Sequence, residues 1–191
     1  GRPVNMSLER EPRVPFVTER SQLPAEAHDQ YDSLVESRGG IQGPFGVLLH
    51  RPELAGRVGR LGAYVRFESS LADRDRELAI LTTARALDCA FEWAIHAPIA
   101  REAGVTETTL EAVIDGDSDS LSDHEASVVR YGRELLDGST VSRETFAAAE
   151  SRFDTEGLVE LTATVGYYAM LACVLNAFDV VPASETPLDG S

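Results

Sequence analysis

Lysine is absent from this 191-residue chain, and all 17 of its basic residues are arginine. The chain has 32 aspartate and glutamate residues, so its formal net charge is −15. An anionic surface repels phosphate backbones, and the composition therefore disfavours nucleic-acid binding. Two explanations of the composition stay open. One is a cytoplasm of very high salt, where ions screen self-repulsion, and the other is a GC-rich genome that prefers arginine codons.

Cysteine is scarce: Cys89 and Cys173 are the only two, they lie far apart in apolar surroundings, and no Cys-x-x-Cys occurs. This usage disfavours a disulfide framework. The first 25 residues are polar and contain several prolines, a pattern that does not match a signal peptide. The most apolar stretch, 158–178, contains polar residues, so we interpret it as a buried core helix rather than a membrane span. We therefore expect a cytoplasmic protein with no membrane partner.

Strand patterns are also lacking, and no repeat of about 20 to 50 residues is found. The prediction is an all-α fold, a single-domain helical bundle of about eight or nine helices. Residues 1–5, before Met6, look like the remnant of a tag. We expect the proline-rich residues 6–24 to form an extended arm over the surface or over a neighbouring subunit. Residues 25–182 then form the helical domain, and 183–191 a flexible tail.

Helical periodicity and end signals set the expected elements. Thr106, Ser122 and Ser142 are predicted N-caps, because their hydroxyls can accept from backbone N–H groups in the first turn. Asp88 and Thr155 are predicted to cap two further helices in the same way. The expected helices cover residues 25–37, 43–50, 52–69, 75–87, 89–103, 106–114, 122–136, 142–153 and 155–178.

The most informative chemical pattern is Cys89, Glu92 and His96, spaced i, i+3 and i+7. A helix places all three on one face over about two turns. Because Glu92 and His96 are one turn apart, the carboxylate should hydrogen-bond the imidazole, fix its tautomer and raise its pKa. Cys89 would fall in the first turn if Asp88 caps the helix. The helix end would then favour a thiolate there, while Glu92 opposes it.

Each of these residues also has a purely structural interpretation. A Glu-x-x-x-His spacing on a helix is usually a surface pair, and Cys89 alone is more often a small buried apolar residue. Trp93 is more often part of a core than a substrate platform, and His50 is more often a surface or capping residue.

The same residues also offer a possible metal site. Glu77 with Glu92 and His96 offers two carboxylates and one imidazole, which is a known ligand set. The sequence supplies only one histidine there, so we expect no metal and no other cofactor.

Three segments carry a family resemblance. They are Arg76-Glu77-Leu-Ala-Ile-Leu, then Cys89-Ala-Phe-Glu92-Trp-Ala-Ile-His96-Ala-Pro, and then Ala-Arg-Glu-Ala-Gly. Together they resemble the carboxymuconolactone decarboxylase-like superfamily, which includes alkyl hydroperoxidase D. The resemblance covers roughly residues 25–182. It implies an alkyl hydroperoxidase D-like fold and a homo-oligomer, either a trimer or a hexamer.

The resemblance also bears on the reaction. In the hydroperoxidase members a glutamate precedes a Cys-x-x-Cys by twelve residues and a histidine follows. Here Glu77, Cys89 and His96 keep those places, but Glu92 replaces the second cysteine, which puts a disulfide-cycling peroxidase in doubt. The decarboxylase members lack the cysteine pair and are thought to work by proton transfer. Cys173 could serve as a partner only if the last helix packs against the site.

The resemblance thus favours a cofactor-free lyase or isomerase that acts on a small carboxylated or carbonyl substrate. His96 would be the general acid/base, Glu92 and Glu77 would orient and tune it, and Cys89 would line the pocket. Two alternatives are a thiol-dependent hydroperoxide reductase that uses Cys89, and a non-catalytic oligomeric binding protein. Four residues are candidates for substrate contact: Trp93, Arg85, His50 and Tyr168. Three arginines could hold an acidic group: Arg66, Arg74 and Arg85.

Overall fold

The structure is a computed structural model that describes residues 6–189; the expected tag remnant at 1–5 lies outside the described residues. Over that range the fold is all-α, without strands and with one isolated bridge between Leu8 and Pro182. The prediction of an all-α bundle is confirmed. The described residues form nine α-helices, namely α1 His28–Arg38, α2 Phe45–Leu48, α3 Pro52–Ala63, α4 Asp73–Ala86, α5 Ala90–Glu102, α6 Glu107–Asp115, α7 Asp123–Gly138, α8 Arg143–Glu150 and α9 Thr155–Ala177.

Three short elements complete this list: the 3-10 helices η1 Arg20–Gln22 and η2 Ala25–Ala27, and the π-helix η3 Tyr64–Glu68. The single helix expected over 52–69 is therefore α3 followed by a π-helical turn. Such turns are rare and are often found beside functional sites.

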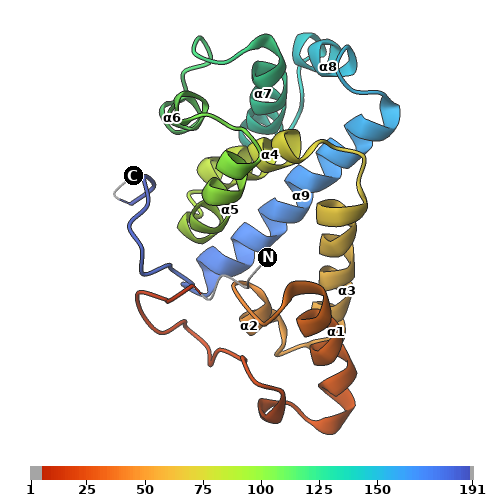
Figure 1. The fold of residues 1–191 in the computed structure, drawn as a ribbon, viewed down its shortest axis with the longest axis vertical. Coiled ribbons are helices and arrows are strands. Elements are labelled where there is room, and N and C mark those ends of the chain that lie inside the picture. The colour runs from red at the N-terminus through yellow and green to blue at the C-terminus, as the bar shows by residue number, and fades with distance from the viewer. Residues whose placement is uncertain (1–5, 190–191) are drawn as a thin grey trace.

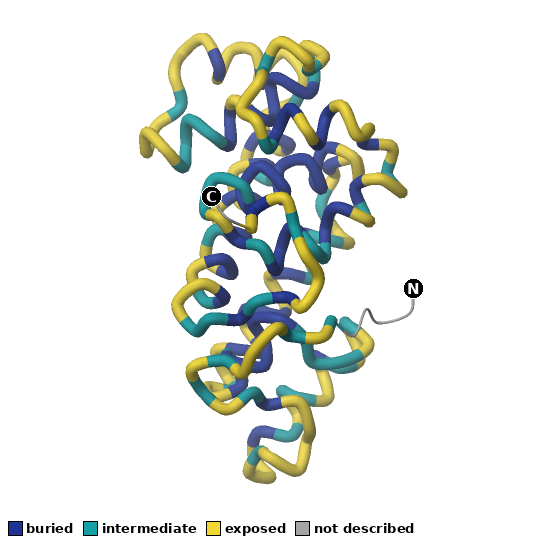
Figure 2. The backbone as a smooth tube through the Cα atoms, turned by 90° about the vertical axis from the view of Figure 1, so that its left-hand side faces the viewer, coloured by how far each residue is buried: buried dark blue, intermediate teal, exposed yellow. Residues whose placement is uncertain are grey.

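Helix α4 lies at the centre of the fold. All ten residues from Asp75 to Ala84 are buried, and α4 packs against α5, α7 and α9. A helix that is covered on every side belongs in the middle of a bundle. In Figure 1, α4 and α9 cross near the middle, α6 to α8 lie above them, and α1 to α3 lie below and to the right. Figure 2 shows the buried segments running through the interior of the molecule.

Helix α9 is long and apolar enough to cross a membrane by length and composition, but half of its most apolar window is buried inside the fold. Its buried side chains join all three core clusters, for example Leu161, Tyr168 and Leu175. This packing fits the expected core helix. Its contact with α4 also brings the α9 face that carries Tyr168 toward α5.

Three of the five predicted N-caps are present in the structure, and two are not. Thr106, Ser122 and Ser142 each accept a hydrogen bond from the backbone N–H three residues on, as expected. Asp154 caps α9 instead of Thr155, since its carboxylate accepts from the Gly157 N–H at 2.7 Å. The prediction that Asp88 caps α5 is wrong as well. Asp88 has a positive φ of 46°, its carboxylate accepts from Arg85, and the next residue occupies the N-cap position.

The two chain ends lie against each other along one side of the domain. Backbone hydrogen bonds join Glu9 to Val181 and Arg13 to Phe178, so the proline-rich arm runs over its own subunit (Figure 1). In the segment expected to be a tail, Leu188 is buried in the main core cluster. Leu188 therefore holds this segment against the domain through apolar contacts, while most of its neighbours in 183–189 are exposed.

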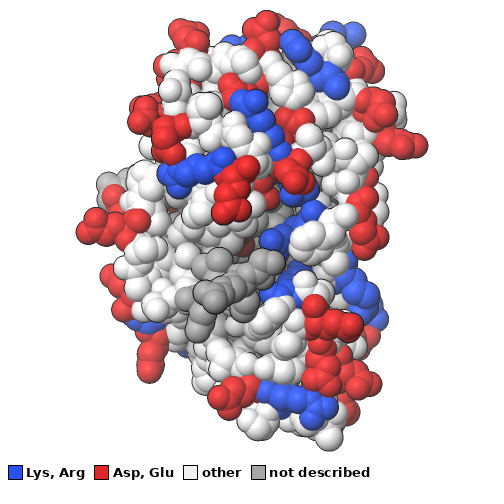
Figure 3. Space-filling view, viewed as in Figure 1, with Lys and Arg blue, Asp and Glu red and all other residues white. Residues whose placement is uncertain are grey.

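The excess of acidic residues in the composition is visible on the surface. Acidic side chains lie along most of the outline of the face seen in Figure 3, and basic side chains gather nearer its middle.

Candidate active site

The turn between α4 and α5 sets the geometry of the candidate site. Glu77 is on α4, ten residues before Leu87, which follows the end of that helix. His96 is on α5, seven residues after Cys89, the N-cap of that helix. The positive φ of Asp88 lets the chain reverse within a few residues, so α5 packs back along α4. Glu77 and His96, which are 19 residues apart in the sequence, thereby meet in the core.

His96 lies between two carboxylates. Its Nδ1 is 2.6 Å from Oε2 of Glu77, and its Nε2 is 3.3 Å from Oε2 of Glu92. The imidazole is 3% exposed, and the two carboxylates are equally well buried. The contact expected from the helical spacing, His96 with Glu92, is thus present, but the shorter contact is the one to Glu77. A carboxylate at Nδ1 fixes the ring orientation and leaves Nε2 as the nitrogen for proton exchange.

Arg76 completes this buried group, which we call the Arg–Glu–His–Glu cluster: Arg76, Glu77, His96 and Glu92. The Nε of Arg76 is 3.5 Å from Oε1 of Glu77 and makes no hydrogen bond within the described residues. Its Nη2 donates to Asp73 at 2.9 Å. With the imidazole protonated, two positive groups balance two carboxylates. Such a balance is what allows charges to be buried at all.

The pKa of His96 is raised from 6.5 to about 9. Burial is the largest influence and lowers this pKa, because it disfavours the charged ring. The charge and hydrogen bond of Glu77, followed by those of Glu92, act in the opposite direction and outweigh burial. His96 is therefore an imidazolium at neutral pH, a proton donor rather than a vacant base.

Tyr168, a predicted substrate contact, does lie at this site. Its ring stands edge-on to the His96 ring, with centroids 5.1 Å apart. Burial raises the Tyr168 pKa well above its usual value, so the phenol stays protonated. Within the described part of the chain its hydroxyl has no hydrogen-bond partner, whereas that of Tyr167 donates to the Val58 carbonyl.

Cys89 is fully buried in an apolar cluster that includes Ala172 and Leu175 of α9. Burial, and then the charge of Glu92, raise its pKa from 9.0 to about 12. The helix end does act as expected, since the backbone N–H groups of Glu92 and Phe91 lower this pKa, but burial outweighs them and the thiol stays protonated. Helix α9 does pack against this region, as a role for Cys173 would require, but both cysteines are free and Cys173 is exposed.

The other predicted contacts lie elsewhere. Trp93 faces away from His96 and lines a separate cleft. Arg85 donates to the Ile114 carbonyl and to Asp88, and the exposed His50 ring bonds the Pro15 carbonyl. Among the arginines proposed for an acidic substrate, Arg74 pairs with Glu125.

Arg66, on the π-helix, is the one of those three arginines whose charge acts on Tyr168. Arg76 was not singled out from sequence, although it stands beside Glu77 in the quoted motif. The signal that would have found it is burial of a charged residue, which no local pattern reveals.

No group of three His, Cys, Asp and Glu side chains in the described residues is arranged to hold a metal ion. The geometry explains why Glu77, Glu92 and His96 do not form one. Each nitrogen of the imidazole faces a carboxylate, so neither presents a lone pair to a shared cation.

The fold is all-α and of the alkyl hydroperoxidase D-like type. The model of the Carboxymuconolactone decarboxylase family matches residues 52–131, which include Arg76, Glu77, Cys89, Glu92 and His96. The resemblance to this superfamily, expected from the sequence, is thereby confirmed. A comparison with curated proteins finds no match.

Solved structures show the same fold. The alkylhydroperoxidase AhpD core protein from Ralstonia eutropha JMP134, an uncharacterized peroxidase-related protein, gives a TM-score of 0.73 at 18% identity over 90% of this chain and 92% of that one. The debrominase Bmp8, a cysteine-to-alanine variant in complex with 2,3,4-tribromopyrrole, gives 0.72 at 14% identity over 95% and 96%. A peroxidase-related protein from Silicibacter sp. TM1040 gives 0.71 at 13% over 95% and 98%. At these identities the likeness establishes the fold alone.

Proposed function

We propose that the protein is a cofactor-free lyase or isomerase in which His96 transfers a proton to or from carbon in a small carboxylated or carbonyl substrate. The observation that carries this proposal is the buried imidazole of His96 held between the carboxylates of Glu77 and Glu92. A proton donor of raised pKa stays loaded at neutral pH and gives its proton only when a strong base develops beside it.

A decarboxylation illustrates the proposed step. The bond between carbon and the substrate carboxylate breaks, carbon dioxide leaves, and the electron pair stays on carbon as an enolate. The Nε2–H bond of His96 then breaks, and its proton forms the new C–H bond. Glu77 keeps Nδ1 protonated throughout, and solvent returns a proton to Nε2. The longer contact, between Nε2 and Glu92, is the one that a substrate would replace.

Two side chains support the choice of substrate class. The Tyr168 hydroxyl, with no partner among the described residues, is available to donate to a carbonyl oxygen as negative charge develops there. Arg66 lies close enough for its charge to act on Tyr168, and a guanidinium can hold a carboxylate. Both groups suit an acid or lactone, and neither suits a cationic substrate.

The test is a search for proton exchange at carbon. The protein is incubated in D2O with a panel of small keto acids, carboxylated lactones including carboxymuconolactone, and neutral ketones, and deuterium uptake and carbon dioxide release are measured. We expect catalysed exchange or decarboxylation for at least one carboxylated compound, with loss in Glu77→Gln. No catalysis for any member of the panel, or equal catalysis by the variant, would argue against the proposal.

Peroxide reduction is expected to be weak or absent. Cys89 has a pKa of about 12 and no second cysteine in its motif, so it forms little thiolate and has no resolving partner there. The measurement is turnover of an alkyl hydroperoxide with a dithiol reductant, in the unmodified protein and in Cys89→Ser and Cys173→Ser. Robust turnover that disappears in Cys89→Ser alone would reverse this expectation.

We also propose that the protein is a homo-oligomer that associates through α9. From Val159 to its end at Ala177, every exposed residue of this helix is uncharged, in a chain with a net charge of −15. These exposed residues are Val159, Thr162, Ala163, Gly166, Met170, Cys173, Asn176 and Ala177, and the exposed Glu156 lies one turn before them. Small residues on a helix allow a neighbouring subunit to approach closely, and burying them removes apolar surface from water.

Gly166→Arg tests this interface. A side chain at Gly166 meets nothing within 4 Å in the protomer, so the fold should tolerate it, but an arginine there would block a second subunit. We expect light scattering to show an oligomer for the unmodified chain and a species near 20.7 kDa for the variant. Gly138→Arg, at the exposed end of α7 and also in open space, is the matched control. A 20.7 kDa monomer for the unmodified chain would refute the proposal.

A further inference from the structure

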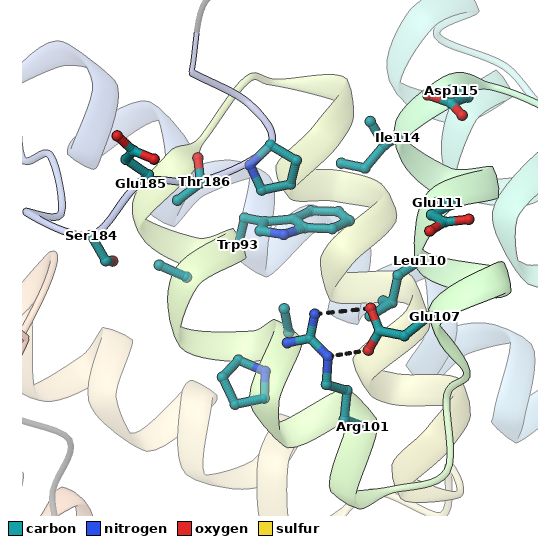
Figure 4. Close-up of a pocket in the computed structure, with 14 residues that line it drawn as sticks. Trp93, Arg101, Glu107, Leu110, Glu111, Ile114, Asp115, Ser184, Glu185 and Thr186 are labelled. Atoms are coloured by element: carbon teal, nitrogen blue, oxygen red, sulfur yellow. Dashed lines mark hydrogen bonds and ion pairs between the residues drawn. The ribbon is translucent and has the colours of Figure 1, made fainter.

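A second concave site lies on the other side of α5 from His96. It is bounded by α5, α6 and residues 184–187 of the C-terminal segment, and it has a volume of about 380 Å³. We call it the α5–α6 cleft. Figure 4 shows Trp93 in its middle, with Ile114 and Leu110 on the α6 side and Glu185 and Thr186 on the C-terminal side. This volume falls within the roughly 300–1,000 Å³ range of small-molecule sites.

The cleft is separate from the Arg–Glu–His–Glu cluster. On α5 the cleft takes Trp93, Ala97 and Arg101, spaced i, i+4 and i+8, whereas Glu92 and His96 form a row on a different face. Neither of those two residues lines the cleft. A ligand in the cleft therefore has the thickness of a helix between itself and His96.

Charge in the cleft is unbalanced. Its one basic residue, Arg101, is engaged by both carboxylate oxygens of Glu107. Glu111, Asp115 and Glu185 also line the cleft, and within the described residues they have no hydrogen-bond or ion-pair partner. A bound anion would be repelled by these three carboxylates, and a bound cation would be attracted by them.

The Trp93 side chain adds an independent and directional feature. It is only 4% exposed, it lines the cleft, and its indole N–H has no hydrogen-bond partner in the described part of the chain. An indole N–H is a donor only, and this one is not among the fully buried atoms, so it reaches the open space of the cleft. A ligand that brings an acceptor oxygen as well as a positive charge can therefore pair with both kinds of group in the cleft.

We propose that the α5–α6 cleft binds a small organic amine: a protonated ammonium group near Glu111 and Asp115, an apolar body against Leu110 and Ile114, and an oxygen that accepts from the Trp93 indole. This class of ligand pairs with the indole N–H and with the two carboxylates of α6. It differs in charge from the acidic substrate proposed for the His96 site, so the two sites would take different molecules.

The chain offers a direct readout, because Trp93 is its only tryptophan. Phenylalaninol, an amino alcohol with an aromatic body, is titrated while the tryptophan emission is followed. The matched compounds are 3-phenylpropan-1-ol, which lacks the ammonium group, and 3-phenylpropanoate, which carries the opposite charge. We expect a saturable change with phenylalaninol, a much weaker one with the alcohol and none with the anion, and weaker binding at high salt.

The double variant Glu111→Gln, Asp115→Asn keeps Trp93 and removes two charges. We expect the dissociation constant for phenylalaninol to rise by roughly tenfold, since each exposed charge contributes modestly. Glu102→Gln, an exposed residue of α5 outside the cleft lining, is the matched control and should change nothing. Glu92→Gln should also bind normally, so this proposal can fail or succeed independently of the acid/base function.

Three results would overturn the assignment: equal affinity for phenylalaninol and the uncharged alcohol, tighter binding of the anion, or no saturable change with any of the three compounds. Equal weakening by the double variant and by Glu102→Gln would do the same, because it would assign the effect to general surface charge.

Discussion

Glu77→Gln is expected to lower turnover of the proton-transfer reaction by roughly 10²- to 10⁴-fold, the loss typical when acid–base assistance is removed. The substitution keeps the shape of the side chain but removes the charge that holds His96 as an imidazolium at 2.6 Å. Glu92→Gln acts on the longer contact of 3.3 Å and should cost less. His96→Asn, which removes the donor itself, should cost the most.

The losses should also be non-additive. Once His96 is absent, the charge of Glu77 has no catalytic proton to influence, so adding Glu77→Gln to His96→Asn should change turnover little. The measurement is the deuterium-exchange or decarboxylation rate of the single and double variants, with Glu102→Gln on the outer surface of α5 as control. Purely additive losses, or near-normal turnover in His96→Asn, would make these residues a structural group instead of a catalytic one.

His96→Ala should destabilise the fold by roughly 3–5 kcal/mol, the cost typical of breaking a buried ion pair by removing one partner. From helical spacing alone one would expect His96→Ala to change the stability little, because an α-helix does not require an imidazole. In the structure, however, the substitution leaves the buried carboxylates of Glu77 and Glu92 opposed only by Arg76. Urea unfolding at neutral pH measures the loss in the free energy of unfolding.

The matched control is His50→Ala, since His50 is exposed and bonds only the Pro15 carbonyl. Adding Glu77→Gln to His96→Ala should restore part of the lost stability, because it removes one of the two uncompensated charges. If His96→Ala and His50→Ala cost the same, the buried charge balance does not hold the site together.

The titration of His96 should also make the stability of the fold depend on pH. Because the pKa of His96 is about 9 in the folded protein and 6.5 ordinarily, the folded state retains the proton over this interval. The contribution is complete below about pH 6.5, declines as pH rises and is lost above about 9, with a total of up to roughly 3 kcal/mol. Unfolding free energies measured from pH 6 to 10 should fall more steeply for the unmodified protein than for His96→Ala. Parallel curves would contradict this account.

Much of the architecture follows from local rules that the sequence states directly. Helical periodicity and the capping hydroxyls of Thr106, Ser122 and Ser142 mark where helices begin, because capping is decided within one turn. The face shared by Glu92 and His96 is likewise a property of a single helix. The resemblance to the Carboxymuconolactone decarboxylase family is also visible in the sequence, because its motif is contiguous in the chain and the family model matches residues 52–131.

Only the tertiary structure decided the chemistry of those residues. The reversal at Asp88 brought Glu77 to His96, and the packing of α4 and α9 placed Arg76 and Tyr168 beside them. The same packing buried the Cys89 thiol and turned Trp93 toward another cleft. The physical reason is that spacing fixes which side chains share a helix face, but a pKa depends on how completely water is removed around a group and on which charges replace it. Both are set by helices that meet only after the chain has folded.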